Sequence, residues 1–214
     1  MKKNLTEMVF ILDRSGSMSS LTEETIGGFN SMIEKQKQED GDAYVTTVLF
    51  DNQYEMLHDH VNIQDVKPIT DEYWARGTTA LLDAIGLTIN SVGKRLDNTH
   101  EEERPEKVIF VITTDGHENA SQEFTKDSIK KMIEHQQDKY SWVFMFLGAN
   151  MDAVSEASSL GINSAFSRTY TASGLGTQSV YNAVSSTLSY ARGVSSHAEG
   201  DWTTQAAACL DAVQ

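Results

Sequence analysis

Residues 8–18 read MVFILDRSGSM, an apolar run that ends in an aspartate and continues into a short polar loop. The five residues before Asp13 are apolar throughout instead of alternating, which is typical of a strand buried on both faces of a parallel sheet. Asp13, Ser15 and Ser17 stand at alternate positions, and Gly16 allows the loop between them to curl tightly. The stretch predicts a buried strand whose carboxyl end presents oxygen-bearing side chains.

The rest of the chain alternates between strand and helix patterns. We expect further strands over 108–112, 142–147, 44–50, an edge strand over 55–63 and a weaker strand over 165–170. We expect helices over 22–39, 80–96, 128–139, 152–160 and 178–192. This order predicts an α/β fold with a doubly wound, mostly parallel Rossmann-like sheet, helices on both faces and one antiparallel edge strand. We expect a single domain over 1–200, with 201–214 as a C-terminal tail or docking helix.

Composition excludes several classes of protein. The chain has 214 residues, and 17 basic against 31 acidic side chains give a net charge of −14, which is unsuited to a nucleic-acid backbone or an anionic membrane surface. The lone cysteine, Cys209, excludes an intramolecular disulfide and a multi-cysteine zinc cluster. The apolar run over 8–12 is too short for a signal peptide, and no segment reaches the length of a membrane span. We therefore expect a cytoplasmic protein.

Two carboxylates end apolar strands. Asp13 follows the run 8–12, and Asp115 follows the run 108–112 after two threonines. Ligands of open parallel sheets bind outside the carboxyl ends of the strands, so we expect these two acids to meet at one site.

Hydroxyl groups accompany both carboxylates. Residues 113–116 read TTDG, and residues 76–85 read RGTTALLDAI, with threonines before a long helix. Two carboxylates, two serines and a threonine form an all-oxygen set that suits Mg²⁺ or Mn²⁺. Two carboxylates only balance the charge of a divalent cation, so the metal stays electrophilic. This pattern predicts recognition of a partner's Asp or Glu side chain through the metal.

These three elements together resemble the von Willebrand factor type A (vWA) domain and its metal-ion-dependent adhesion site (MIDAS). The resemblance extends over roughly residues 5–195 and implies the vWA fold. It implies that Asp13, Ser15, Ser17 and Asp115 are metal ligands, together with one threonine. The family pattern has an alanine five positions after that threonine, and counting back from Ala84 selects Thr79, with Thr78 as the alternative.

The resemblance also implies a function. The metal of such a domain binds an acidic side chain of a protein partner, often with a shift of ligands and of the last helix, and one acid can reach the metal through water. With no signal peptide, the chain is similar to the bacterial or phage intracellular type. Members of that type often work beside AAA+ ATPases or in tellurium-resistance-like systems. The acidic surface predicts that the partner has a basic rim around its carboxylate.

An enzyme is the main alternative. A Mg²⁺-dependent phosphohydrolase or phosphotransferase of Rossmann-like fold also uses an aspartate after its first strand. It needs a second acid two positions later as general acid/base, and Ser15 occupies that position here. We therefore expect a binding module and not an enzyme.

Other polar residues allow two interpretations each. His58 and His60, two apart on a strand, point to one face and can chelate a metal, or they belong to an exposed edge strand. His117 and Glu118 either rim the site and select partners or are ordinary loop residues. Arg14 and Arg76 either offset the local negative field or are solvated. Residues 169–191 contain no charge, which fits a segment packed on the sheet or an interaction surface.

Overall fold

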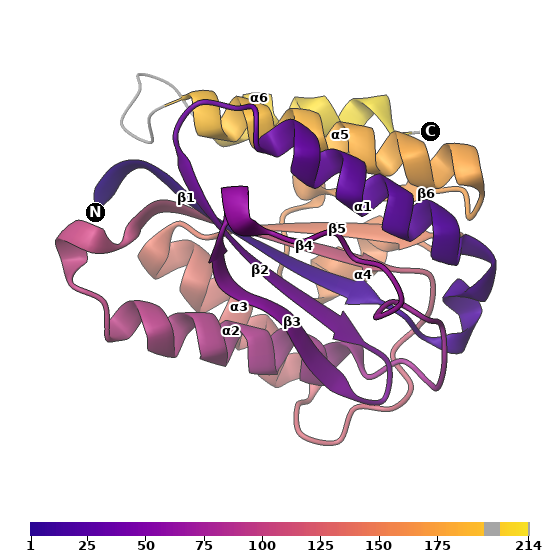
Figure 1. Cartoon of the computed structure of the whole chain (residues 1–214). Helices are drawn as coiled ribbons and strands as arrows, with labels where there is room; N and C mark the ends of the chain where they lie inside the picture. Colours follow the sequence, from indigo (N-terminus) through magenta and orange to yellow (C-terminus); the bar gives the residue numbers. More distant parts are fainter. Residues whose placement is uncertain (195–201, 214) are drawn as a thin grey trace.

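The computed structural model describes residues 1–194 and 202–213, and its centre is a six-stranded sheet (Figure 1). The strands are β1 (Lys2–Asp13), β2 (Asp42–Phe50), β3 (Tyr54–Asn62), β4 (Pro105–Thr114), β5 (Val143–Ala149) and β6 (Ser167–Tyr170). They lie in the order β3-β2-β1-β4-β5-β6, and only the edge strand β3 is antiparallel to its neighbour. The predicted doubly wound sheet with one antiparallel edge strand is confirmed.

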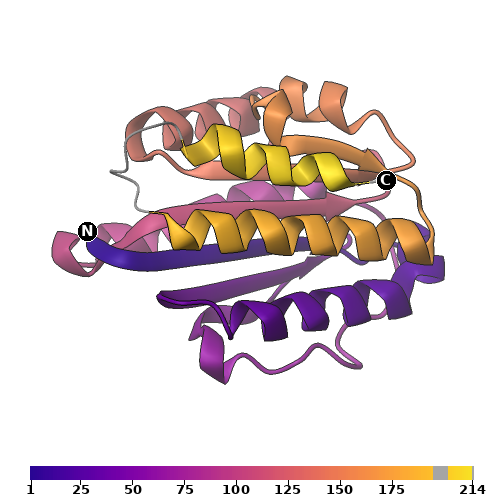
Figure 2. The ribbon, with the colours of Figure 1, turned by 90° about the horizontal axis from the view of Figure 1, so that it is seen from above.

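Helices cover both faces of the sheet. The α-helices are α1 (Thr22–Gln36), α2 (Leu81–Asp97), α3 (Lys126–Tyr140), α4 (Ala153–Ser159), α5 (Gly174–Gly193) and α6 (Trp202–Ala208). Short 3-10 turns are η1 (Gly16–Leu21), η2 (Ile63–Asp65), η3 (Glu101–Glu103), η4 (Ser164–Phe166) and η5 (Cys209–Ala212). One face carries α1, α5 and α6, which Figure 2 shows lying over the sheet and running along its strands, and the other carries α2, α3 and α4.

The continuous apolar runs of the sequence are explained by the helices that cover both faces of the sheet. In β1, Met8, Phe10 and Leu12 pack beneath α1 and α5, whereas Val9 and Ile11 pack beneath α2. All five side chains are fully buried, because a central strand has no solvent face.

The C-terminal segment also joins the core. Ala206, Ala207 and Leu210 of α6 and η5 are buried in the same cluster as α5. The expected boundary between residues 200 and 201 lies outside the described residues. Within 1–194 and 202–213, no helix combines the length and apolarity needed to cross a bilayer.

The topology places two loops side by side. From β1 the chain continues to β2 on one side, and β4 pairs with β1 on the other, so the strand order reverses between β1 and β4. Leu12 is paired with Thr113, which brings the carboxyl ends of β1 and β4 together. This reversal is the usual ligand position of a doubly wound sheet.

Candidate metal centre

The loop after β1 is folded around the carboxylate of Asp13. The Ser15 backbone N–H donates to Asp13 Oδ1 at 2.7 Å, which turns the chain back and places Ser15 and Ser17 over the strand end. Their Oγ atoms lie 3.1 Å apart. Asp13 and Ser15 are buried, whereas Ser17 is exposed, so the loop runs from the core to the surface within five residues.

The end of β4 supplies the second carboxylate. Thr114 Oγ1 donates to Asp13 Oδ2 at 2.6 Å, and Ser17 Oγ donates to Asp115 Oδ1 at 2.5 Å. The two predicted acids are therefore joined through hydroxyl groups from both strand ends. Asp115 is half-buried and remains accessible from outside.

The start of α2 completes the site. Thr79 is buried and Thr78 is exposed. A methyl group added at Gly116 would lie 3.3 Å from Thr79 Oγ1 and 3.7 Å from Ser17 Oγ, so both hydroxyls face the same small space beside Asp115. The geometry thus favours Thr79 over Thr78 as the fifth oxygen of the set.

Burial changes the proton affinity of both acids. Loss of hydration raises the pKa of Asp13 to about 6, although hydrogen bonds from Thr114 and Ser15 oppose the rise. Burial also raises the pKa of Asp115, against a hydrogen bond from Ser17. Burial disfavours the charged forms of these two neighbouring carboxylates. A bound cation would stabilise those charged forms.

The oxygen spacing fits a small hard cation. Octahedral Mg²⁺ lies about 2.1 Å from each ligand, so adjacent ligand oxygens are about 3 Å apart. The Ser15–Ser17 separation of 3.1 Å matches that spacing, and the Ser17–Asp115 separation of 2.5 Å is slightly shorter, as in a hydrogen bond. Nowhere in 1–194 and 202–213 do three His, Cys, Asp or Glu side chains gather as a metal cluster, so a cation here depends on hydroxyl ligands.

Known structures share this architecture. The vWF domain of the type V pili tip protein Mfa5 from Porphyromonas gingivalis is similar with a TM-score of 0.62 and 9% identity, over 92% of this chain and 97% of that chain. A von Willebrand factor type A structure from Catenulispora acidiphila has a TM-score of 0.58 and 11% identity, over 86% of this chain and 42% of that chain. The chain has the vWA fold.

A third vWA structure carries a metal. Proximal thread matrix protein 1 from the mussel byssus, solved with a zinc-occupied MIDAS motif, is similar with a TM-score of 0.52 and 17% identity, over 79% of this chain and 42% of that chain. This chain spans less than half the length of the mussel structures it resembles. No protein-family model and no curated protein matches the sequence. At such identities the likeness establishes the fold, and function has to be argued from the site.

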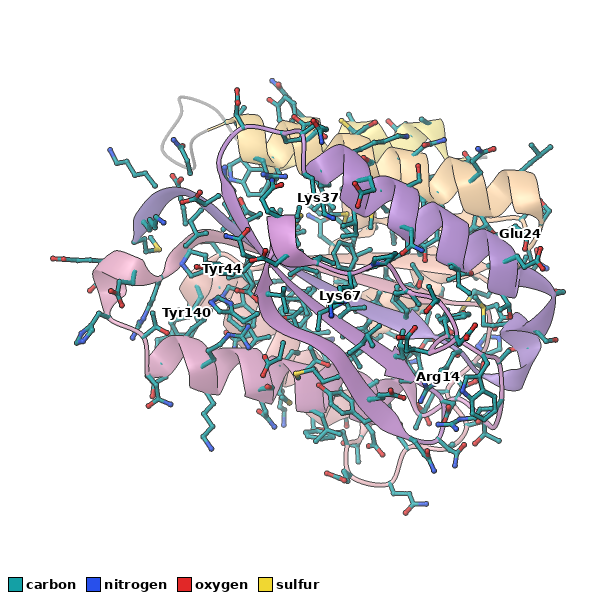
Figure 3. All side chains as sticks on the ribbon, viewed as in Figure 1. Arg14, Glu24, Lys37, Tyr44, Lys67 and Tyr140 are labelled. Carbon is teal, nitrogen blue, oxygen red and sulfur yellow. The ribbon has the colours of Figure 1, made fainter. Side chains whose placement is uncertain are left out.

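Sequence reasoning missed an ion-pair cluster beside the candidate site. Arg14 is 1% exposed, and its Nε donates to Asp51 Oδ2 at 3.0 Å while Nη1 donates to Glu55 Oε2 at 2.7 Å. Arg76 Nε donates to the same Asp51 oxygen at 2.8 Å. Figure 3 shows Arg14 at the end of the sheet toward which the β1 and β2 arrows point in Figure 1.

The solvated interpretation is therefore wrong for Arg14. A signal was present in the sequence, because Asp51 ends an apolar run over 48–50 as Asp13 ends the run over 8–12. Asp51 is fully buried and held by two guanidinium groups, which leaves it unsuited to a metal.

The interpretation of His58 and His60 as neighbours on one face is also wrong. Two register shifts in the β2–β3 pairing interrupt the alternation, and His60 has a positive φ of 53°. His60 Nδ1 lies 2.7 Å from Glu7 Oε2 on the α2 side, whereas His58 pairs with Thr47 on the opposite face and is buried. The exposed-edge interpretation fails for His58 as well.

His117 and Glu118 lie in different surroundings on the loop after β4. Glu118 accepts hydrogen bonds from the Leu82 N–H at 2.9 Å, from the Ala120 and Ser121 N–H groups and from Ser121 Oγ, so it ties the loop after β4 to the first turn of α2. His117 is exposed on this loop. Residues 169–191 form part of β6 and most of α5, and α5 packs on the sheet.

Proposed function

We propose that this vWA-fold chain is a divalent-cation-dependent protein-binding module. Asp13, Ser15, Ser17, Thr79 and Asp115 would hold Mg²⁺ or Mn²⁺, which would ligate an acidic side chain of a protein partner. The gathering of hydroxyl and carboxylate oxygens from three separate segments at the strand reversal carries this proposal. A bound cation supplies Lewis acidity toward an incoming carboxylate.

Each segment of the chain has a distinct task in this proposal. Asp13, whose two oxygens are already held by Ser15 and Thr114, supports the loop and offers charge from beneath. Ser15, Ser17 and Thr79 offer neutral oxygens, and Asp115 is the more accessible carboxylate. Only two negative charges face the cation, which leaves it able to attract a third from outside.

The same geometry argues against a phosphohydrolase. A nucleophilic aspartate has to bring a free oxygen to the substrate, whereas Asp13 is fully buried and hydrogen-bonded at both oxygens. Ser15 stands where the general acid/base would be needed. A binding role without catalysis is therefore our proposal.

The surrounding charge bears on the partner. The chain carries 31 acidic and 17 basic residues, so a partner carboxylate approaches against repulsion. We propose that the partner compensates with a basic rim and that raising salt weakens binding. Nucleic acid and membrane surfaces do not fit this charge. An intracellular bacterial setting beside an AAA+ ATPase or a tellurium-resistance-like system stays a prediction from sequence resemblance.

Thermal unfolding tests the metal site. A cation that binds only the folded chain, at a hundred times its Kd, adds about 2.7 kcal/mol. For a chain of this size that corresponds to a rise in Tm of roughly 5–11 °C over the value in EDTA. The double variant Asp13→Ala, Asp115→Ala should lose this rise. Asp138→Ala, which changes an exposed carboxylate on α3, should keep it.

Two results would contradict the proposal. A wild-type chain that responds to Mg²⁺ and Mn²⁺ no more than the double variant has no site at these residues. Turnover of a generic phosphoester that disappears in the double variant would favour the enzyme.

A further inference from the structure

Three of the five exposed large apolar residues among those described, Trp74, Val154 and Leu175, lie on segments at the end of the molecule that carries the candidate site. Each of the three is at least two-fifths exposed. Trp74 precedes α2, and the other two lie in the first turns of α4 and α5, just after the carboxyl ends of β5 and β6. Single exposed apolar residues are ordinary on protein surfaces, so this placement alone decides nothing.

Trp74 differs because its surroundings hold it in place. The Arg76 guanidinium lies 4.2 Å from the centre of its ring. Arg76 is fixed in turn, because Nε donates to Asp51 Oδ2 at 2.8 Å and Nη2 donates to Gln53 Oε1 at 2.9 Å. Asp51 is fully buried, so the ion pair that orients Arg76 is anchored in the core. Trp74 is thus 51% exposed, while one face of its indole is covered by a guanidinium held by two hydrogen bonds.

The segment that carries Trp74 is also fastened to the proposed metal loop. The Arg76 N–H donates to the Arg14 carbonyl at 2.8 Å, and the Gly16 N–H donates to the Gly77 carbonyl at 3.2 Å. On the other side of Trp74, the buried Tyr73 hydroxyl donates to the Asp13 carbonyl. Two backbone bonds and one bond from the Tyr73 hydroxyl therefore join the segment that carries Trp74 to the loop that carries the proposed ligands. These bonds set the position of Trp74 relative to the proposed metal site.

An exposed tryptophan stacked on a held arginine beside the proposed metal centre is suited to binding a partner. Tryptophan and arginine are enriched among the residues that dominate interface energies, and a side chain that is already ordered loses little entropy on binding. The open face of the indole suits an apolar or aromatic side chain. An acidic side chain would be repelled by the surrounding acids unless the metal receives it.

We propose that Trp74 is a specificity-determining contact for the partner. The partner segment that gives its carboxylate to the metal carries, at a fixed spacing, a large apolar side chain that packs on the open face of Trp74. This inference rests on the proposed function. It adds to the basic rim a local apolar requirement that net charge alone does not predict.

Random linear peptides displayed on phage provide the probe. They are bound to the immobilised full chain in Mg²⁺ and eluted with EDTA, which recovers only metal-dependent binders. We expect the eluted peptides to share an Asp or Glu and a large apolar residue at constant spacing. One such peptide is then synthesised, and its Kd is measured by fluorescence polarisation for the wild-type chain and each variant.

The variants distinguish a specific contribution of Trp74 from the effect of removing any exposed aromatic side chain. Trp74→Ala should weaken binding on the order of thirtyfold, and Trp74→Phe should recover most of the affinity. Tyr140→Ala is the matched control, because Tyr140 is similarly exposed, by 48%, at the opposite end of the molecule (Figure 3). Its affinity should equal that of the wild type.

The possible failures are distinguishable. Peptides that share an acid but no apolar position, or a peptide that binds Trp74→Ala as tightly as wild type, would overturn the role of Trp74 and leave the metal site standing. A Trp74→Ala chain that also loses its Mg²⁺-induced rise in Tm would make Trp74 a support of the metal loop, which also refutes the inference. If the wild-type chain yields no EDTA-eluted peptide, the proposed function itself fails.

Discussion

Gly28 lies in the middle of α1, directly against the ring of Tyr181 in α5. A methyl group at this position would lie 2.9 Å from Tyr181 Cγ and closer still to Cδ2. Tyr181 is 4% exposed, and the clash falls on Cγ and Cδ2 at the base of its ring, so the methyl group cannot be accommodated by a shift of the ring tip alone. Extra carbon in a well-packed interior typically costs about 1–3 kcal/mol.

The neighbouring Gly27 gives an internal control. A methyl group there meets nothing within 4 Å, so Gly27→Ala reports the gain in helix propensity by itself, about 1 kcal/mol. Gly28→Ala receives the same gain and adds the clash. The free energy of unfolding of Gly28→Ala should therefore lie about 1–3 kcal/mol below that of Gly27→Ala. The corresponding difference in Tm is roughly 2–12 °C for a chain of this size.

Urea unfolding at constant pH measures both variants, with equal m-values confirming that the unfolded states are comparable. Replacing Tyr181 by Leu in both backgrounds should remove most of the difference, because the ring and the added methyl are coupled. If Gly28→Ala is as stable as Gly27→Ala, then α1 and α5 do not pack through this contact, and the cover of that sheet face is not as described.

Three further outcomes concern the site. In EDTA, the wild-type chain should gain stability relative to Asp13→Asn as pH falls from above 6 toward 4. Burial raises the folded-state pKa of Asp13 from 3.8 to about 6, so protonation removes a cost of up to about 3 kcal/mol, and Mg²⁺ should reverse the trend; parallel Tm curves would contradict this. Arg14→Met should cost about 3 kcal/mol in urea unfolding because it leaves Asp51 buried with one partner fewer, whereas the more exposed Arg76→Met should cost about 1 kcal/mol; equal losses would refute this ranking. Glu118→Ala should cost about 1–2 kcal/mol and reduce the Mg²⁺-induced rise in Tm, since Glu118 accepts four hydrogen bonds that fix the loop beside the proposed threonine ligand; an unchanged metal response would separate that loop from the site.

The sheet was predictable because its strands are central. A strand covered by helices on both faces is apolar over most of its length, and the runs over 8–12, 108–112 and 142–147 show this directly. Their parallel direction follows, because the helices between them allow parallel pairing, whereas their order in the sheet was not predicted. The meeting of Asp13 and Asp115 then needs only the rule that ligands bind at the carboxyl ends of such strands.

The edge of the sheet was less predictable. Alternation over 55–63 predicted β3 but assumed an unbroken pleat, which would place His58 and His60 on one face. The irregular pairing with β2 and the left-handed backbone of His60 turn that side chain toward Glu7. A β-bulge inserts one extra residue into a strand and moves every later side chain to the other face. The local sequence pattern does not predict where such a bulge occurs.

Patterns within short segments were enough to predict the fold class and to propose the oxygen donors, apart from the choice between Thr78 and Thr79. Contacts between residues far apart along the chain could be read only from the folded structure. It buried Arg14 with Asp51, turned Thr79 toward Gly116 while leaving Thr78 exposed, and fastened the Trp74 segment to the loop of the proposed ligands. The physical reason is that a charged or hydroxyl side chain gains its role from what lies within hydrogen-bonding distance, and that distance is set by the packing of whole strands and helices.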